Sequence, residues 1–238
     1  MKRFLYGFAA WSFLVALPGP AQAQYDFTDI DVPGATYTLA LGINNLGQIV
    51  GEYADVGFYL HGFLLDVDGS YTTLDVPGAI NTFASGINDA GQIVGYYFDN
   101  SGHGFLLDVD GSYTTIDPPG STYTVATGIN NVGQIVGRYS RFFGDGHGFL
   151  LDVDGSYATL DVPGAIQTGA NGINDAGQIV GASVIGNSSS HGFLLDVDGS
   201  YTTLDVPGVS FASARGINDA GQIVGYYDAH GFLATPAP

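Results

Sequence analysis

The stretch that decides the fold is residues 86–120, GINDAGQIVGYYFDNSGHGFLLDVDGSYTTIDPPG. Its parts return along the chain at nearly constant spacing. Gly-Ile-Asn begins at Gly42, Gly86, Gly128, Gly172 and Gly216, in steps of 44, 42, 44 and 44 residues. A repeat of this length and fidelity indicates an array of one supersecondary unit.

Each repeat predicts four short strands, which we place at 83–88, 92–97, 104–109 and 112–117 in this unit. Residues 88–91, Asn-Asp-Ala-Gly, form a turn sequence, because asparagine bonds to its own backbone and glycine takes the left-handed conformation. Asp110-Gly111 is a two-residue hairpin signal. The middle strands carry continuous apolar runs, typical of strands covered on both faces. Four antiparallel strands in this length are a β-propeller blade.

The two ends of the chain predict how the ring closes. The last repeat has strands at 211–218, 222–227 and 231–233 but no fourth strand, whereas residues 25–34 match the pattern of 113–120. We therefore expect an all-β fold, a five-bladed β-propeller of four-stranded antiparallel blades, closed by the N-terminal strand completing the last blade. Such closure removes exposed strand edges. The alternatives are an open β-solenoid and an assembly of partial rings.

Residues 1–23 have the pattern of a secretory signal peptide. Lys2 and Arg3 precede an apolar run at 4–17, and Ala21-Gln22-Ala23 is a small-x-small cleavage sequence. The run is shorter than the roughly 20 residues that span a bilayer, and no later stretch predicts a membrane span. We expect one propeller domain at 24–238, located in the periplasm or secreted to the extracellular space.

The composition excludes several classes of function. The chain carries 23 acidic residues against 5 Lys and Arg, for a net charge of −18, and has no cysteine. A nucleic-acid partner needs a basic face, and a thiolate metal centre needs cysteine. No lysine follows Lys2, so Schiff-base and Walker-type chemistry are excluded from the domain.

The repeats resemble the bacterial extracellular HAF repeats over the whole of 24–238. The resemblance rests on Gly-Ile-Asn, then Gly-Gln-Ile-Val-Gly, then a His-x-Phe core. Glycine stands where the alanine of that family is expected, at Gly62, Gly104, Gly148, Gly192 and Gly231. The resemblance implies a secreted or surface repeat protein and no known reaction.

Three repeated polar positions are candidates for chemistry. Five histidines each open a third strand, at His61, His103, His147, His191 and His230. Equivalent positions of neighbouring blades lie well over about 10 Å apart, too far to share a metal with bonds of about 2 Å. We expect each histidine to hydrogen-bond its own loop or the next blade. Five asparagines end the first strands, and we favour turn capping there over binding of water, an ion or a sugar hydroxyl: Asn44, Asn88, Asn130, Asn174 and Asn218.

The Asp-x-Asp-Gly-Ser hairpins resemble a fragment of a calcium loop but lack its distal bidentate carboxylate. They are weak Ca²⁺ candidates at Asp66, Asp68, Asp108, Asp110, Asp152, Asp154, Asp196 and Asp198. No other metal or cofactor is expected.

The positions that vary most between repeats lie around the loops that join the second and third strands. Aromatic and arginine side chains gather there, which is the usual make-up of a recognition surface. The candidate ligand-binding residues are Tyr53, Phe58, Tyr59, Tyr96, Tyr97, Phe98, Arg138, Tyr139, Arg141, Phe142, Phe143, Tyr226 and Tyr227. Tyr37, Phe83, Tyr123 and Phe211, in the connections between repeats, are expected near the same face.

From these patterns we predict a secreted, monomeric, non-enzymatic binding scaffold that is lectin-like, with a glycan or another extracellular surface component as its partner. The main argument against an enzyme is that the Asp and His positions repeat fivefold, whereas a catalytic centre needs different groups converging on one point. The first alternative is a purely structural or adhesive repeat protein. The second is a glycan hydrolase or lyase, and a carboxylate pair such as Glu52 and Asp55 could serve the hydrolase.

Overall fold

A computed structural model of the chain describes residues 28–186, 189–205, 209 and 211–236. The predicted signal peptide lies outside these residues. The described part contains nineteen β-strands, and it has no helix long and apolar enough to cross a membrane.

Each repeat forms one antiparallel unit, as the sequence predicts. Repeat 1 holds β1 (Tyr37–Ile43), β2 (Ile49–Ala54), β3 (Leu60–Leu65) and β4 (Tyr71–Leu74). Repeat 2 holds β5 (Asn81–Ile87), β6 (Ile93–Phe98), β7 (Gly102–Leu107) and β8 (Tyr113–Ile116). Repeat 3 holds β9 (Tyr123–Ile129), β10 (Ile135–Ser140), β11 (His147–Leu151) and β12 (Tyr157–Leu160). Repeat 4 holds β13 (Gln167–Ile173), β14 (Ile179–Ile185), β15 (Ser189–Leu195) and β16 (Tyr201–Leu204), and repeat 5 holds β17 (Ala212–Ile217), β18 (Ile223–Tyr227) and β19 (His230–Ala234).

The predicted turns are confirmed. Asn88 Oδ1 accepts a hydrogen bond of 3.0 Å from the Gln92 amide, and Gly91 takes φ +86°. In the hairpin before β8, Gly111 takes φ +85° and its amide bonds to the Asp108 carbonyl at 2.9 Å. Both φ values lie in the left-handed region that glycine adopts without strain.

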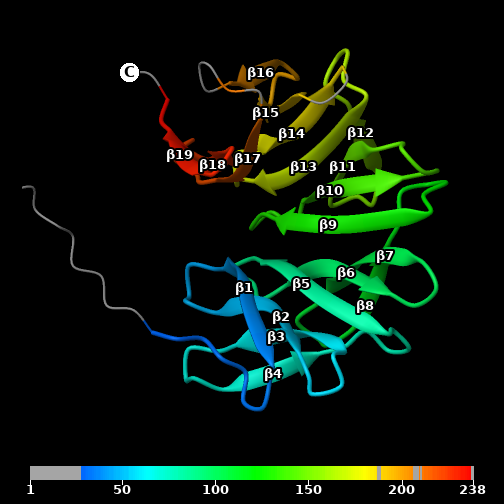
Figure 1. Cartoon of the computed structure of the whole chain (residues 1–238), viewed down its shortest axis with the longest axis vertical. Coiled ribbons are helices and arrows are strands. Elements are labelled where there is room, and N and C mark those ends of the chain that lie inside the picture. Colours follow the sequence, from blue (N-terminus) through cyan, green and yellow to red (C-terminus); the bar gives the residue numbers. More distant parts are fainter. Residues whose placement is uncertain (1–27, 187–188, 206–208, 210, 237–238) are drawn as a thin grey trace, which may run out of the picture.

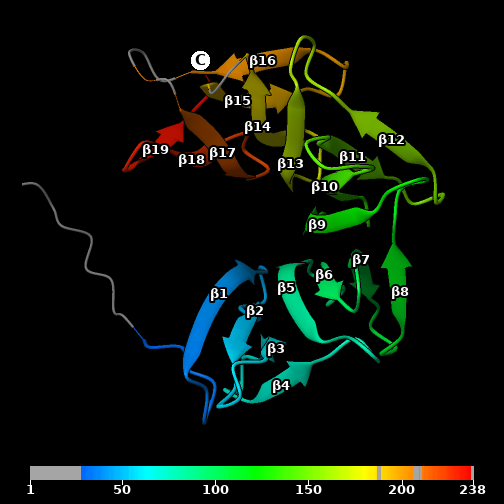
Figure 2. The same ribbon diagram turned by 45° about the vertical axis from the view of Figure 1, so that its right-hand side comes forward.

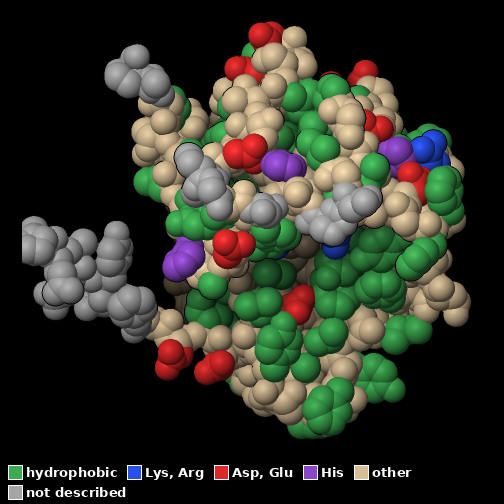
Figure 3. Space-filling view, turned by 45° about the horizontal axis from the view of Figure 1, so that its top comes forward, with side chains coloured by type: hydrophobic (Ala, Val, Ile, Leu, Met, Phe, Trp, Pro, Cys, Tyr) green, Lys and Arg blue, Asp and Glu red, His purple; other side chains and the backbone are tan. Residues whose placement is uncertain are grey.

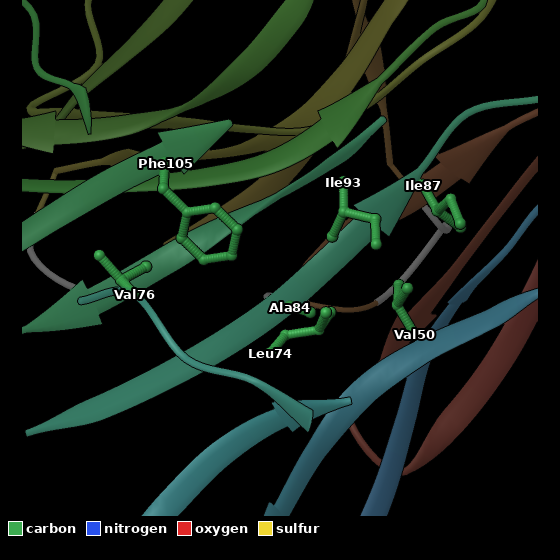
Figure 4. Packing of buried hydrophobic residues seen from close by; sticks show 7 residues of the cluster. All are labelled: Val50, Leu74, Val76, Ala84, Ile87, Ile93 and Phe105. Carbon is green, nitrogen blue, oxygen red and sulfur yellow. The ribbon is translucent and has the colours of Figure 1, made fainter. Parts of the chain in front are cut away.

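The core lies between successive repeats, not within one. Figure 4 shows Val50 and Leu74 of repeat 1 packed toward Ala84, Ile93 and Phe105 of repeat 2. The valine at the second position of the second strand is fully buried in each of the first four repeats, as expected for strands covered on both faces. Each sheet is therefore stabilised by the next one along the chain.

The sheets follow one another around an arc, with β1 and β17–β19 at its two ends (Figures 1 and 2). Neighbouring repeats are also joined through their backbones. Gly102 of β7 pairs with Tyr123 of β9 in parallel, which merges repeats 2 and 3 into one eight-stranded sheet. Isolated parallel bridges join Gly146 to Gln167 and Ser190 to Phe211 at the next two junctions.

The prediction of a closed five-bladed propeller is wrong. The sheets hold four, eight, four and three strands, and the last consists of β17–β19 alone. The expected closing strand was 25–34; of this, residues 28–32 form no strand. Val32 makes the bonds found in other connections between repeats: its amide bonds to Thr38 Oγ1 at 3.1 Å and its carbonyl accepts from the Ala35 amide at 3.0 Å, as Val76 bonds to Thr82 Oγ1 and Ala79. This turn holds the segment beside β1, at the opposite end of the arc from β19.

Candidate functional site

Two matching strand positions hold side chains that differ from repeat to repeat. One position, in the second strand, holds Glu52, Tyr96, Arg138, Ala182 and Tyr226 in the successive repeats. The other, in the first strand, holds Leu41, Ser85, Thr127, Asn171 and Arg215. Because the scaffold repeats and these side chains do not, they can contribute to an asymmetric site.

Several of these side chains meet in one pocket formed by repeats 3, 4 and 5. The cavity measures about 330 Å³. Its lining includes Tyr123, Arg138, Asn171, Phe211, Arg215 and Tyr226. The pocket therefore combines two guanidinium groups, an amide and aromatic rings, contributed by strands that the repeat-to-repeat packing holds together.

We call this cavity the arginine pocket. Its two arginines, Arg138 and Arg215, form no ion pair in the described part of the chain. Arg215 Nη2 donates a hydrogen bond of 3.2 Å to the Tyr226 hydroxyl, and its Cζ lies 5.1 Å from the centre of the Tyr226 ring. Arg138 packs beside Gly169, since a Cβ built on that glycine would lie 3.7 Å from the Cβ of Arg138. Both arginines are exposed, so their charge is available to a ligand.

The third arginine of the domain is engaged at the edge of the pocket. Arg141 Nε lies 3.2 Å from Asp145 Oδ2, and the other Asp145 oxygen lies 2.6 Å from His147 Nε2. Burial acts to raise the pKa of Asp145. The hydrogen bonds from Arg141 and the charge of His147 outweigh burial and hold that pKa below its ordinary value. Asp145 therefore stays ionised; it also lines the pocket, where its ion-pair partners are Arg141 and His147.

The predicted ligand-binding residues separate into groups. Only Arg138, Tyr139 and Tyr226 line the arginine pocket. Tyr96 stacks on Phe83 with ring centroids 4.4 Å apart, and Phe98 packs against both rings. Burial, with the nearby charge of Glu52, raises the pKa of Tyr96 to about 12. These aromatic side chains serve packing between strands.

A second group of the predicted aromatics packs on the repeated histidines. Each has its ring centroid 5.1 to 5.4 Å from a histidine ring, and the members are Tyr53, Tyr97, Tyr139 and Tyr227. A third group is exposed at the loop tips, namely Phe58, Tyr59, Phe142 and Phe143. Hydrophobic side chains gather in the lower half of the face shown in Figure 3, where Lys and Arg occupy little of the surface. A binding role for the exposed loop aromatics stays a prediction.

The histidines pair with aspartates of their own repeats. Nδ1 lies 2.6 to 2.9 Å from a carboxylate oxygen in His61–Asp75, His103–Asp117, His147–Asp161 and His191–Asp205. In repeat 2, Ser101 Oγ also lies 3.0 Å from His103 Nε2, the order of contacts found in a serine hydrolase triad. Because the His–Asp pair recurs in four repeats, its role is to connect the third strand to the end of the fourth.

The hairpin aspartates are occupied by their own turns. Asp110 Oδ1 accepts from the Ser112 amide at 2.9 Å, and Asp108 Oδ1 accepts from the Val109 amide at 2.8 Å. The side-chain and backbone hydrogen bonds from Ser112 hold the pKa of Asp110 below its usual range. Among the described residues, no three His, Asp or Glu side chains are grouped as metal ligands.

The asparagine ring lines a second cavity of about 280 Å³ on the axis of the arc, and it caps turns as predicted. Besides accepting from its own turn, each of the first four asparagines donates to the next repeat. Asn88 Nδ2, for example, lies 3.2 Å from the Asn130 carbonyl oxygen. The amides are therefore structural.

Sequence reasoning missed Arg215 and Asn171. Both lie in first strands, which we treated as scaffold, whereas the search for variable positions was confined to loops. The signal that could have found them is the comparison of equivalent positions, since a hydrophobic or hydroxyl residue in one repeat becomes an arginine in another.

Comparison with known proteins shows the fold alone. No protein-family model and no curated protein matches the sequence, so the HAF resemblance stays a prediction. Among solved structures, TolB from Acinetobacter baumannii is 14% identical with a TM-score of 0.58, covering 83% of this chain and 56% of that one. A gluconolactonase from Xanthomonas campestris is 13% identical with a TM-score of 0.51, covering 83% and 73%. Virginiamycin B lyase from Staphylococcus aureus is 12% identical with a TM-score of 0.50, covering 84% and 71%.

These findings correct the prediction of a non-enzymatic, lectin-like scaffold. That prediction argued that repetition of the Asp and His positions excludes a catalytic centre. Proteins that share this propeller-like fold include a lyase and a gluconolactonase, so the fold does not exclude catalysis. Moreover, several side chains that differ between the repeats do come together, in the arginine pocket.

Proposed function

We propose that the protein is a lyase that cleaves a carboxylate-bearing glycan, with the uronate at the reacting position bound in the arginine pocket. The observation that carries this proposal is the convergence of Arg138 and Arg215, from repeats 3 and 5, on one cavity of a strongly acidic chain. Two guanidinium groups that form no ion pair with a described residue provide the charge and the donor geometry that suit a carboxylate.

The residues of the pocket suit elimination next to a carboxylate. In this reaction a base takes the proton from the sugar carbon beside the carboxylate, and a double bond forms to the neighbouring carbon as its bond to the glycosidic oxygen breaks. That oxygen leaves with a proton. Negative charge builds up on the carboxylate in the transition state, where Arg138 and Arg215 stabilise it.

Tyr226 is the proton-transfer group in this proposal. Its hydroxyl accepts a hydrogen bond of 3.2 Å from Arg215 Nη2, so it lies beside the guanidinium that binds the carboxylate. In its ionised form the oxygen accepts the proton from carbon and then delivers it to the leaving oxygen. The predicted secretory leader supports a polymeric substrate outside the cell.

The test is to incubate the protein with polygalacturonate and with alginate and to follow the ultraviolet absorbance of the unsaturated product. We expect turnover of a polyuronate and none of a neutral glycan such as amylose. Arg215→Ala and Arg138→Ala should each reduce the rate by at least about a hundredfold. Arg141→Ala is the matched control, because that arginine is paired with Asp145, and it should retain activity.

Two results would contradict the proposal. One is the absence of any unsaturated product from these polyuronates. The other is polyuronate binding that depends on Arg138 and Arg215 but is never followed by cleavage, which would assign the pocket to recognition alone. Circular dichroism of each variant would separate loss of the site from loss of the fold.

A further inference from the structure

Among the described residues, the last repeat lacks the outer strand that the other four repeats have. In repeats 1 to 4 the third strand pairs antiparallel with a strand of four residues, β4, β8, β12 or β16. In repeat 5 the sheet ends at β19, which pairs with β18 on one side only within the described part. β19 lies at the outer rim of the arc (Figures 1 and 2), so a strand can reach its edge from outside. An unpaired edge of this kind is a template for another strand.

The glycine of the third strand shows where an outer strand would lie. In repeats 1 to 4, a Cβ built on this glycine would lie 3.1 to 3.3 Å from the Cβ of a leucine or isoleucine of the outer strand. The pairs are Gly62–Leu74, Gly104–Ile116, Gly148–Leu160 and Gly192–Leu204. A Cβ built on Gly231 would meet nothing closer than 3.8 Å. The position that an apolar side chain occupies in the other repeats is therefore open beside Gly231.

The phenylalanine that follows this glycine differs in the same way. In repeats 1 to 4 it is fully buried, and its ring centroid lies 5.5 to 6.1 Å from that of the tyrosine that begins the outer strand. Phe232, the equivalent in repeat 5, is only partly buried. Its exposed part is the surface that an outer-strand tyrosine covers elsewhere.

Two polar contacts are also unmade in repeat 5. In repeats 1 to 3 the hydroxyl of the tyrosine in the second strand lies 2.9 to 3.2 Å from a threonine hydroxyl of the outer strand. The histidine of the third strand pairs with the aspartate that follows the outer strand in repeats 1 to 4. Tyr227 and His230 pack on each other with ring centroids 5.4 Å apart, but neither has such a partner among the described residues. All four missing contacts come from one short sequence, Tyr-x-Thr-Leu-Asp, in which isoleucine also serves at the fourth position.

We propose that β19 binds an extended segment of another protein that carries Tyr-x-Thr-Leu-Asp, added antiparallel as the fourth strand of the last sheet. Backbone hydrogen bonds along β19 provide affinity, and the side-chain positions select the sequence. The leucine covers Gly231, the tyrosine packs on Phe232, and the aspartate pairs with His230.

The structure favours another protein over this chain as the source of the strand. The four copies of the sequence in repeats 1 to 4 are already paired within their own sheets, at 71–75, 113–117, 157–161 and 201–205. Residues 28–32 form no strand. No residue of β19 lines the arginine pocket, so the inference does not rest on the proposed lyase activity.

The test is fluorescence anisotropy of a labelled peptide with the sequence of residues 69–77, Gly-Ser-Tyr-Thr-Thr-Leu-Asp-Val-Pro, titrated with the full chain. We expect saturable one-to-one binding, and hydrogen–deuterium exchange should show protection of the amides of β19 when the peptide is bound. Gly231→Val should weaken binding at least about tenfold, because its side chain takes the position of the peptide leucine. The free variant should fold, since Gly231 has open space around its Cβ position. Val224→Thr is the matched control, because Val224 is exposed but lies in β18, away from the edge; it should bind as the unmodified chain does.

The pairing of His230 with the peptide aspartate gives a test of register. His230→Ala should weaken binding of the peptide about fivefold, and the peptide change Asp75→Ala should do the same. Combining the two changes should cost no more than either alone, because both remove one contact.

Three results would overturn the proposal. The first is no saturable binding of the peptide. The second is equal binding by Gly231→Val and the unmodified chain. The third is protection from exchange at another strand while the amides of β19 stay unprotected.

Discussion

His103 Nδ1 lies 2.6 Å from Asp117 Oδ2, across the hairpin that joins β7 to β8. The same pair recurs in repeats 1, 3 and 4. It ties the short outer strand of each repeat to its neighbour at the end opposite the hairpin turn. The outer strands have only four residues, so few backbone bonds hold them, and this side-chain contact is a substantial part of their attachment.

Removing the histidine should loosen the outer strand. His103→Ala should lower the free energy of unfolding by about 1 to 3 kcal/mol, because Asp117 loses its partner while half-buried. Urea denaturation measures the change. His230→Ala is the matched control, since repeat 5 has no described fourth strand and His230 has no carboxylate opposite it among the described residues. Equal losses in the two variants would show that the pair contributes nothing.

The inter-repeat asparagine bond makes a second prediction. Asn130 is 3% exposed, and its Nδ2 bonds to the Asn174 carbonyl at 3.1 Å. Asn130→Ala should lower the free energy of unfolding by about 1 to 3 kcal/mol, since it leaves buried polar groups without partners. Asn218→Ala removes the same turn cap from an exposed position and should cost about 1 kcal/mol less. Denaturant titration of both variants isolates the bond between repeats.

Tyr96 provides a test at alkaline pH. Burial and the charge of Glu52 raise its pKa to about 12, above the value of about 10 for an exposed tyrosine. A raised folded pKa means that the neutral phenol is favoured in the folded chain. Its contribution to stability is complete below about pH 10 and is lost as the pH rises toward 12. In a spectrophotometric titration, Tyr96→Phe should remove one late-ionising tyrosine; an unchanged late phase would contradict this assignment.

The repeated part of the fold could be predicted from the sequence because its signals are local. Asn88 and Gly91 specify a turn whatever surrounds them, and the Asp110-Gly111 hairpin does the same, so strand positions followed directly. Whether the ring closes depends instead on whether the segment before Val32 pairs with β19, and residues 28–32 form no strand. Residues 28–32 have the same strand-like pattern beside β1 as they would beside β19. The choice between these two positions depends on contacts with distant parts of the chain, and the local sequence pattern carries no information about those contacts.

The candidate site divides in the same way. Arg138 and Tyr226 were predicted because they stand out at the ends of second strands. Arg215 and Asn171 were not, since their importance arises from the curvature of the arc, which turns first-strand side chains of repeats 4 and 5 toward Arg138. Conversely, Tyr96 is as conspicuous as Tyr226 in the sequence. Only the neighbouring Phe83, which stacks on its ring, makes it a packing residue.

The last glycine of Gly-Gln-Ile-Val-Gly tests how closely the strands pack. A Cβ on Gly137 would lie 2.1 Å from the Val125 carbonyl oxygen and 2.7 Å from the Phe149 ring, and neither the strand backbone nor the buried ring can move away. Gly137→Ala should therefore destabilise the fold by about 3 kcal/mol or more. Gly231→Ala is the matched control, because its Cβ would meet nothing closer than 3.8 Å, and it should cost less than about 1 kcal/mol. Thermal unfolding followed by circular dichroism measures both variants, and similar midpoints would mean that the strands are more loosely packed than these distances require.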